Sequence, residues 1–375
     1  MLIDHLLSKE VPQAISRKVM SHTARILRKG LNSEVFLEVA ETAVDKIKKS
    51  NMGQGMEDAD SILRNDLFAS CLEEGDFIRA AEALAGLNVE SSARTYQVVE
   101  KADHYVKIAE CYLMNDDSME AEIFVNKAMP LMSEVLMKEI EGNTTRGQQL
   151  NLRYKVTHSR VLDSNRKFLD AAWNYYELSQ FVNIKADELL ELFGKATTCA
   201  ILGKAGPQRD RILGSLYKDE RLGTLEQLEG YSTHAQVLTK MYMQQILRRT
   251  ELRAFEDSLS PHQKAMTSDK MTIPQRAVIE HNMAAAAHIY ENIRFAELGN
   301  VLEIDAQNAE RIAAKMISES RLNGYIDQID GVLHLEDDMD TLKNWDDRIS
   351  DLCLQVNKSW EDIEKTYPQL SPEIR

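Results

Sequence analysis

The stretch of sequence that decides the fold is NGYIDQIDGVLHL, which runs from Asn323 to Leu335. Two short runs rich in apolar residues, 325–329 and 332–335, flank the dipeptide Asp330-Gly331. An Asp-Gly pair between two such runs is the strongest short-range indication of a β-hairpin, because both residues tolerate the positive φ angles of a tight turn. The stretch therefore predicts a two-stranded hairpin, called the wing below.

Three helical patterns precede the wing. Pro274 is placed for the first turn of a helix that extends to residue 290, and a short helix is expected over residues 295–302. Asp305 is a good N-cap for a third helix. The apolar face of that third helix consists of Ala306, Ala309, Ile312, Ala313, Met316 and Ile317. Three helices followed by a two-stranded wing are typical of a winged-helix fold.

A long helix is expected after the wing, from about residue 345 to residue 364. Its apolar residues recur every three or four positions, so they form one stripe that must be buried somewhere. The stripe contains Ile349, Leu352, Cys353, Val356, Trp360 and Ile363. Two partners are open for it: the winged helix of the same chain, or a bundle of equivalent helices from other subunits.

A degenerate helical repeat occupies the region before the winged helix. Three stretches match: EGDFIRAA at 74–81, NDDSMEAE at 115–122 and NRKFLDAA at 165–172. Each has a polar turn followed by a small residue, Ala80, Ala121 or Ala171, which lets two antiparallel helices approach closely. Such pairs stack into a solenoid because a lone pair cannot bury its faces. An irregular helical bundle is the alternative.

The sequence thus predicts an all-α fold: a TPR-like or HEAT-like helical-repeat solenoid, then a winged-helix module with a small β-hairpin and a long C-terminal helix. The solenoid is expected over residues 1–257, and the winged helix over 275–340. Between them the helical periodicity lapses around Pro261, which predicts an exposed loop at 258–274. The C-terminal helix is expected within residues 341–375.

Composition restricts the function classes. The net charge of −15 opposes binding to nucleic acid or to an anionic membrane unless a local basic patch exists. The four cysteines are far apart and never form a C-x-x-C pair, so we expect a reduced intracellular protein with buried thiols. Neither a signal peptide nor an apolar run of about 18 residues is present, so no membrane interaction is predicted.

The sequence predicts no catalytic, cofactor-binding or metal-binding residue. None of the nine histidines forms an H-x-H or H-E-x-x-H pair, and the closest two, His281 and His288, are two helical turns apart. We expect packing or capping roles for both. The third winged-helix helix carries Glu310, Arg311, Lys315 and Glu319, which sum to zero charge. This balance disfavours nucleic-acid binding, although a winged-helix nucleic-acid-binding regulator and an enzyme with a dispersed site stay open as alternatives.

Four stretches resemble one family: LYKDER at 216–221, SPHQKA at 260–265, RAVIEHN at 276–282 and NGYIDQIDG at 323–331. They are similar to PCI-domain proteins, and within that family to subunits of the COP9 signalosome; the PCI domain is expected at about 175–340. The resemblance implies a non-catalytic scaffold in the cytoplasm and nucleus. The resemblance further implies that this scaffold belongs to a complex that removes NEDD8 from cullins and so regulates cullin–RING ubiquitin ligases. A PCI subunit of the proteasome lid is the alternative within the family.

The resemblance also implies how such a subunit binds its partners, the other signalosome subunits and neddylated cullin–RING ligases. The wing offers backbone hydrogen bonds to a neighbouring sheet edge, and the C-terminal helix offers its apolar stripe. The expected partner-binding residues are Tyr325, Ile326, Val332, Leu333, Ile349, Leu352, Val356, Trp360 and Ile363.

Overall fold

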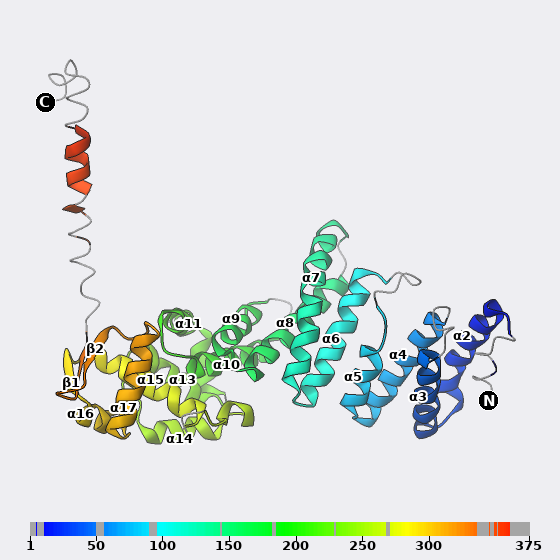
Figure 1. The fold of residues 1–375 in the computed structure, drawn as a ribbon, viewed down its shortest axis with the longest axis horizontal. Coiled ribbons are helices and arrows are strands. Elements are labelled where there is room, and N and C mark those ends of the chain that lie inside the picture. The colour runs from blue at the N-terminus through cyan, green and yellow to red at the C-terminus, as the bar shows by residue number, and fades with distance from the viewer. Residues whose placement is uncertain are drawn as a thin grey trace, which may run out of the picture. The chain divides into compact units, whose positions relative to one another are not determined.

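The computed structural model describes residues 5, 11–49, 56–89, 96–142, 145–181, 185–228, 230–267, 271–335, 345, 349–350 and 352–360. The chain falls into two compact units, Met1–Gly203 (unit 1) and Lys204–Arg375 (unit 2). Helices dominate both units (Figure 1), which confirms the predicted all-α class. The division lies earlier in the chain than the solenoid boundary expected at residue 257.

Unit 1 is a series of helices that pack on one another in chain order. They are α2 (Gln13–Gly30), α3 (Ser33–Lys49), α4 (Glu57–Glu74), α5 (Phe77–Ala85), α6 (Val98–Met114), α7 (Ser118–Gly142), α8 (Thr145–Ser164), α9 (Phe168–Leu178) and α10 (Ala186–Leu202). From α4 to α10, each helix contacts the next. One apolar core runs from Met20 on α2 to Val161 on α8. Helices that each pack on the next helix in the chain form a solenoid, which is the architecture that the repeats predicted.

The three repeat turns share one backbone geometry. Gly75, Asp116 and Arg166 each adopt a positive φ, at 80°, 59° and 62° respectively. In each turn, the following residue donates its N–H to a carbonyl five positions earlier, as Asp76 does to Cys71 at 2.9 Å. This is the Schellman ending of a helix. The polar turn residues that reveal the repeat in the sequence therefore end α4, α6 and α8 in the same way.

The small residue after each turn is fully buried. Ala80, Ala121 and Ala171 have no exposed surface, and each lies on the second helix of its pair. A larger side chain at these positions would overpack the contact between the paired helices. The small residue therefore has the role that the sequence predicted, because it lets the two paired helices approach closely.

Unit 2 contains a second group of helices and one small sheet. Its elements are α11 (Pro207–Tyr217), α12 (Arg221–Gln227), α13 (Ser232–Tyr242), α14 (Arg249–Asp257), the 3-10 helix η2 (Pro261–Lys264), α15 (Ile273–Ala287), β1 (Asn292–Arg294), α16 (Phe295–Leu302), α17 (Ala306–Ser318), β2 (Gly324–Asp327) and β3 (Val332–Leu335). Residues 349–350 and 352–360 are also helical.

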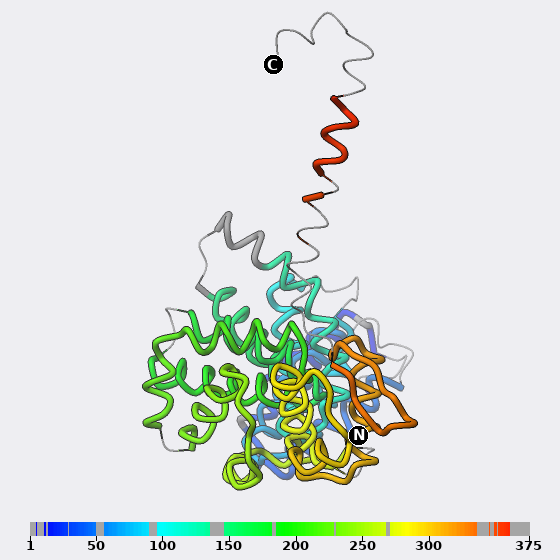
Figure 2. Tube along the Cα trace, turned by 90° about the vertical axis from the view of Figure 1, so that its left-hand side faces the viewer, coloured from blue at the N-terminus to red at the C-terminus, as the bar shows by residue number. Residues whose placement is uncertain are grey.

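The winged helix forms around one apolar core. The side chains of Met283 on α15, Leu298 on α16 and Ile312 on α17 pack in this core with Leu333 on β3. The hairpin, orange in Figure 2, therefore closes one side of the three helices. Pro274 lies in the first turn of α15, as predicted. Asp305 occupies the N-cap position of α17, but its side chain makes no capping hydrogen bond.

The sheet has three strands rather than the two predicted, in the antiparallel order β1-β3-β2. The additional strand, β1, pairs Ile293 with Leu333. The sequence does not reveal β1 because it has only three residues and its partner lies about forty residues away. The wing turn is also longer than expected: Asp327 Oδ1 accepts the N–H groups of Ile329 and Asp330, at 2.9 and 3.3 Å.

Gly324 is required where β2 begins. Its φ is 153°, and a Cβ at this position would lie 2.2 Å from the carbonyl oxygen of His334 on the neighbouring strand. No side chain fits so close to backbone, and positive φ is costly for residues other than glycine. Gly324 therefore permits the close approach of β2 to the end of β3.

The segment 258–274 is only partly the exposed loop that the sequence predicted. Leu259, Gln263 and Ile273 are buried, and Met266 pairs with Thr272 in an isolated β-bridge. The polar composition was misleading because a single 3-10 turn, η2, directs Gln263 inward. Ser258, Ser260, Pro261 and Met266 are exposed, so the segment is anchored at some residues and lies on the surface at others.

We expect Gln263→Ala to lower the free energy of unfolding by about 1–2 kcal/mol, because it removes both a capping hydrogen bond and buried packing. The Gln263 side-chain oxygen accepts the N–H of Ser260 at 3.2 Å. Urea unfolding measures the change, and Met266→Ala is the control because that side chain is 63% exposed. If both variants unfold at the wild-type urea concentration, the segment is not anchored as described.

Candidate protein-binding site

The outer face of the wing is the first candidate surface. Tyr325 is exposed and its ring stacks on His334 across the strands, with ring centroids 4.6 Å apart. Val332 is half-buried on this face, whereas Ile326 pairs with Leu333 and packs, half-buried, against the winged-helix core. Leu333 is fully buried in the winged-helix core, so the prediction that it binds a partner is wrong. The alternation of a strand explains this, because Val332 and His334 lie on the opposite face of β3 from Leu333.

The edges of the sheet are β1 and β2, because β3 lies between them. The predicted edge strand is therefore β2, and within the described residues no strand pairs with its outer side. The sequence reasoning missed Ile329, which is 96% exposed in the turn beside β2. The signal was present in the sequence, since an isoleucine between Gln328 and Asp330 is an apolar residue in a polar turn.

The C-terminal helix is the second candidate surface. Leu352 and Val356 are 63% and 60% exposed, and Ile349 and Trp360 are exposed as well. Ile363, the last predicted member of the stripe, lies outside the described residues. Cys353 is exposed on the same helix, whereas the other three cysteines are buried, so the expectation of four buried thiols is wrong for Cys353.

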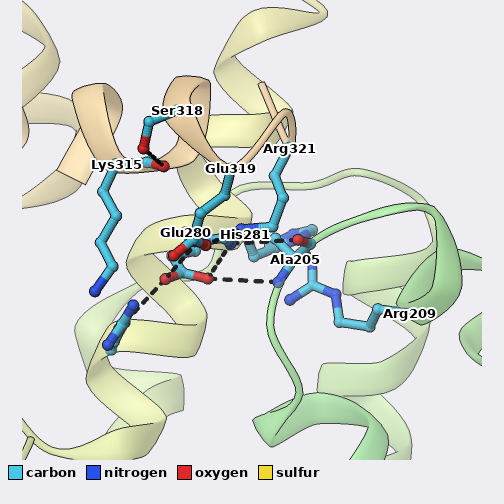
Figure 3. Close-up of polar contacts among 9 residues, drawn as sticks. Ala205, Arg209, Glu280, His281, Lys315, Ser318, Glu319 and Arg321 are labelled. Carbon is cyan, nitrogen blue, oxygen red and sulfur yellow. Dashed lines mark hydrogen bonds and ion pairs between the residues drawn. The ribbon is translucent and has the colours of Figure 1, made fainter. Parts of the chain in front are cut away.

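A buried polar cluster holds the helical and winged-helix parts of unit 2 together (Figure 3). Glu280 on α15 is almost fully buried, and its carboxylate accepts from Arg276 Nε at 2.9 Å and from Arg321 Nη1 at 2.6 Å. It also accepts the backbone N–H of Ala205 at 3.4 Å. One carboxylate thus links α15 to the segment before α11 and to the segment after α17.

The next two residues of α15 bind a third segment, the connection between α13 and α14. Asn282 makes two hydrogen bonds to the backbone of Leu247, each 2.9 Å long. His281 is fully buried, with Nε2 at 2.9 Å from the carbonyl oxygen of Gln245. Because a carbonyl only accepts, Nε2 carries the proton, and Nδ1 accepts from Nη2 of Arg209 at 3.4 Å.

The pKa values of His281 and Glu280 are both lowered, which leaves the histidine neutral and the carboxylate charged. Burial, assisted by the positive charge of Arg209, lowers the pKa of His281 to about 4, so the imidazole is neutral at pH 7. Burial alone would raise the pKa of Glu280, but its ion pairs with Arg321 and Arg276 outweigh burial and hold that pKa below its usual value. Glu280 is therefore the anion of the cluster.

Two family models match the chain. The model described as "PSMD12/CSN4, N-terminal" matches residues 1–187, and the model described as "PCI domain" matches residues 234–337. COP9 signalosome complex subunit 4 of Arabidopsis thaliana is 39% identical over 370 residues, which are 97% of this chain and 88% of the relative. The protein of the same name from Dictyostelium discoideum is 38% identical over 98% of this chain and 88% of the relative. The Drosophila melanogaster protein of that name is 43% identical over 77% of this chain and 67% of its own.

The chain belongs to the COP9 signalosome subunit 4 family.

This confirms the signalosome resemblance seen in the sequence and disfavours the alternative of a proteasome-lid subunit, because the three relatives carry signalosome names. The match to the PCI domain runs from α13 to β3, and so includes the wing and the Glu280, Arg276 and Arg321 side chains of the buried cluster. Membership in the subunit 4 family, together with the PCI domain, indicates a scaffold subunit without a catalytic role.

Among the described residues, no group of three or more His, Cys, Asp or Glu side chains is placed to hold a metal ion. His281 has a packing role, and His288 is the C-cap residue of α15, as the sequence predicted. Burial raises the pKa of the Cys71 and Cys111 thiols to about 11, which makes them poor nucleophiles. The described helices include none with the length and apolar character needed to cross a membrane.

We expect unit 2 to lose stability as the pH falls from about 6.5 toward 4. His234 is also buried, and burial lowers its pKa to about 4. A histidine whose pKa is lower in the folded state binds a proton more readily in the unfolded state. Its contribution to stability is therefore complete above the unfolded pKa of about 6.5 and is lost as the pH falls toward the folded pKa. Each of the two histidines therefore lowers the free energy of unfolding by roughly 2 kcal/mol between pH 7 and pH 5.

Urea unfolding at the two pH values measures this loss, and the variant that carries both His234→Gln and His281→Gln should show a much smaller pH dependence than the wild type. An equally steep loss in the double variant would assign the acid sensitivity to other groups.

Proposed function

We propose that this chain is the subunit 4 scaffold of a COP9 signalosome complex, which removes NEDD8 from cullins and thereby regulates cullin–RING ubiquitin ligases. The observation that carries the proposal is the 39% identity to the Arabidopsis thaliana protein across 97% of the chain, which spans the repeats, the PCI domain and the C-terminal stripe. Its partners are the other signalosome subunits and neddylated cullin–RING ligases. Its compartments are the cytoplasm and the nucleus, and the catalytic metal site belongs to another subunit.

Two surfaces support assembly. The outer edge of β2 carries backbone groups that another strand would extend into a larger sheet, with Tyr325 and Ile329 exposed beside it. The C-terminal helix carries exposed Leu352 and Val356, which favour burial against apolar helices of other subunits. Ile326, Val332, Ile349, Trp360 and Ile363 belong to the same two proposed surfaces.

Purification of the tagged full chain from its own cells, followed by mass spectrometry, tests the proposal. The expected result is a set of signalosome subunits in equal amounts with the tagged chain. Recovery of proteasome-lid subunits would replace the proposal with the paralogous complex. Recovery of nucleic acid, released by salt, would favour the winged-helix regulator.

The isolated chain should bind no stoichiometric zinc and cleave no NEDD8–cullin conjugate. The nine histidines include no H-x-H pair, and the described residues hold no cluster of metal-binding side chains. Elemental analysis and a cleavage assay with the purified complex as the positive control measure both properties. One tightly bound zinc ion per chain, or cleavage by the chain alone, would contradict the scaffold role.

A further inference from the structure

A cleft of about 580 Å³ lies in unit 1 at the end of α5. α5 has only 9 residues, whereas α6 and α7 have 17 and 25, so the two longer helices extend past it (Figure 1). The end of α5, residues 87–89, α6 and α7 line the cleft. Its volume is within the range of about 300–1,000 Å³ that is usual for ligand pockets, so it has room for several side chains.

The lining of the cleft is mostly apolar and aromatic. Helices α6 and α7 each contribute residues spaced three or four apart, which therefore share one face of their helix. They are Lys101, Tyr105 and Ile108 on α6, and Phe124, Lys127 and Leu131 on α7. The ring centroids of Tyr105 and Phe124 are 6.4 Å apart, so the two faces meet at a pair of aromatic rings. Such a surface favours the burial of large apolar side chains.

The cleft is locally positive in an acidic protein. Lys101 and Lys127 line it, and no Asp or Glu does, although the chain as a whole has a net charge of −15. Neither lysine forms an ion pair with another described residue of the chain. The ammonium group of Lys127 lies 4.8 Å from the centroid of the Phe124 ring, so this charge is held beside the apolar lining. The cleft therefore combines apolar surface with two uncompensated positive charges.

We propose that this cleft binds an acidic amphipathic segment of a partner protein. Two lysines on different helices favour an occupant with at least two carboxylates, whereas a fatty acid or another small monoanion offers one. A helix with apolar residues every three or four positions and acidic residues between them carries both kinds of group. Its apolar side would cover Tyr105 and Phe124, and its carboxylates would pair with Lys101 and Lys127.

This surface is distinct from the two surfaces proposed for assembly. The cleft belongs to unit 1, whereas the edge of β2 and the C-terminal helix belong to unit 2. Its chemistry differs as well, because the C-terminal stripe is apolar and the edge of β2 offers backbone groups. The cleft thus selects its partner by charge in addition to apolar contact.

Fluorescence anisotropy of labelled peptides with the full chain tests the proposal. The probe is acetyl-DEELFEALLEEA-amide. Its counterpart acetyl-NQQLFQALLQQA-amide keeps the apolar residues without the charge, and acetyl-DEEAAEAAAEEA-amide keeps the charge without the large apolar residues. We expect saturable binding of the probe and a Kd at least about tenfold higher for each counterpart. Equal affinity for the probe and either counterpart would overturn the proposal.

Variants of the two lysines connect the binding to the cleft. In Lys127→Glu and in Lys101→Glu the probe should bind at least about tenfold more weakly, because the new carboxylate repels it. Lys155→Glu is the matched control, since the Lys155 ammonium also lies over an aromatic ring, 5.0 Å from the centroid of Phe181, but on α8 and outside the cleft lining. It should keep the wild-type Kd. An equal loss in all three variants would show general charge attraction and would overturn the proposal.

Photo-crosslinking locates the bound peptide without any change to the protein. A probe with benzoylphenylalanine in place of its phenylalanine should crosslink to residues 84–89, 101–108 or 124–131. Crosslinks to the C-terminal helix instead would assign the binding to its exposed stripe and would overturn the proposal. Self-association of the chain that Lys127→Glu abolishes would assign the cleft to a second copy, and tighter binding of a single-stranded oligonucleotide than of the probe would assign it to nucleic acid; either result would also overturn it. Because the test uses the isolated chain, its outcome is independent of the proposed role in the signalosome.

Discussion

The variant that carries both Leu352→Asp and Val356→Asp should fold normally yet fail to join its complex. In the wild type both side chains are more than half exposed, so their replacement removes no described packing within the chain. Buried against other subunits, the two apolar side chains would together contribute about 3–6 kcal/mol, and the aspartates add a cost of burying charge. The expected loss of affinity is at least about a hundredfold, because each 1.4 kcal/mol is a factor of ten.

Co-purification with the tagged variant measures incorporation, and thermal unfolding of the isolated chain measures folding. The control variant carries Gln355→Asp and Asn357→Asp, which adds the same charge to exposed positions outside the stripe. It should enter the complex with an unchanged Tm. A markedly lower Tm for the Leu352 and Val356 variant would show instead that the stripe packs on its own winged helix. Full incorporation with an unchanged Tm would mean that the stripe serves neither purpose.

Glu280→Ala should destabilise unit 2 by about 3–5 kcal/mol, the usual cost of removing one partner from a buried ion pair. Glu280 is 2% exposed and pairs with Arg276 and Arg321, so its removal leaves both guanidinium groups without their shared anion. It also leaves the N–H of Ala205 without its acceptor. The three segments that meet at α15 would separate more readily.

Hydrogen exchange of α15 peptides, followed by mass spectrometry, reports on this unit directly, and exchange should accelerate by at least a hundredfold. Glu319→Ala is the matched control, because Glu319 also pairs with Arg321 but is partly exposed. Its loss should cost no more than about 1 kcal/mol. Equal effects of the two substitutions would show that burial of Glu280 does not decide the strength of its pairs.

Most of the secondary structure could be predicted from the sequence because its causes are local. The ends of α4, α6 and α8 depend on hydrogen bonds that span five residues, such as the bond from Asp76 to Cys71. The buried face of α17 follows from the helical period, and the wing follows from an apolar–turn–apolar pattern within thirteen residues. The exposed loop predicted at 258–274 was right only in part, because composition does not show that one 3-10 turn buries Gln263.

By itself, the sequence determined the repeats, the winged helix and the family, since each depends on residues close together in the chain. Only the tertiary structure decided that β1 completes the sheet, that Leu333 faces the core, and that Glu280 is the anion of a buried cluster. The physical reason is separation along the chain. Glu280 meets Arg321 across 41 residues and Ala205 across 75, and no local pattern encodes which distant charge a buried carboxylate will contact.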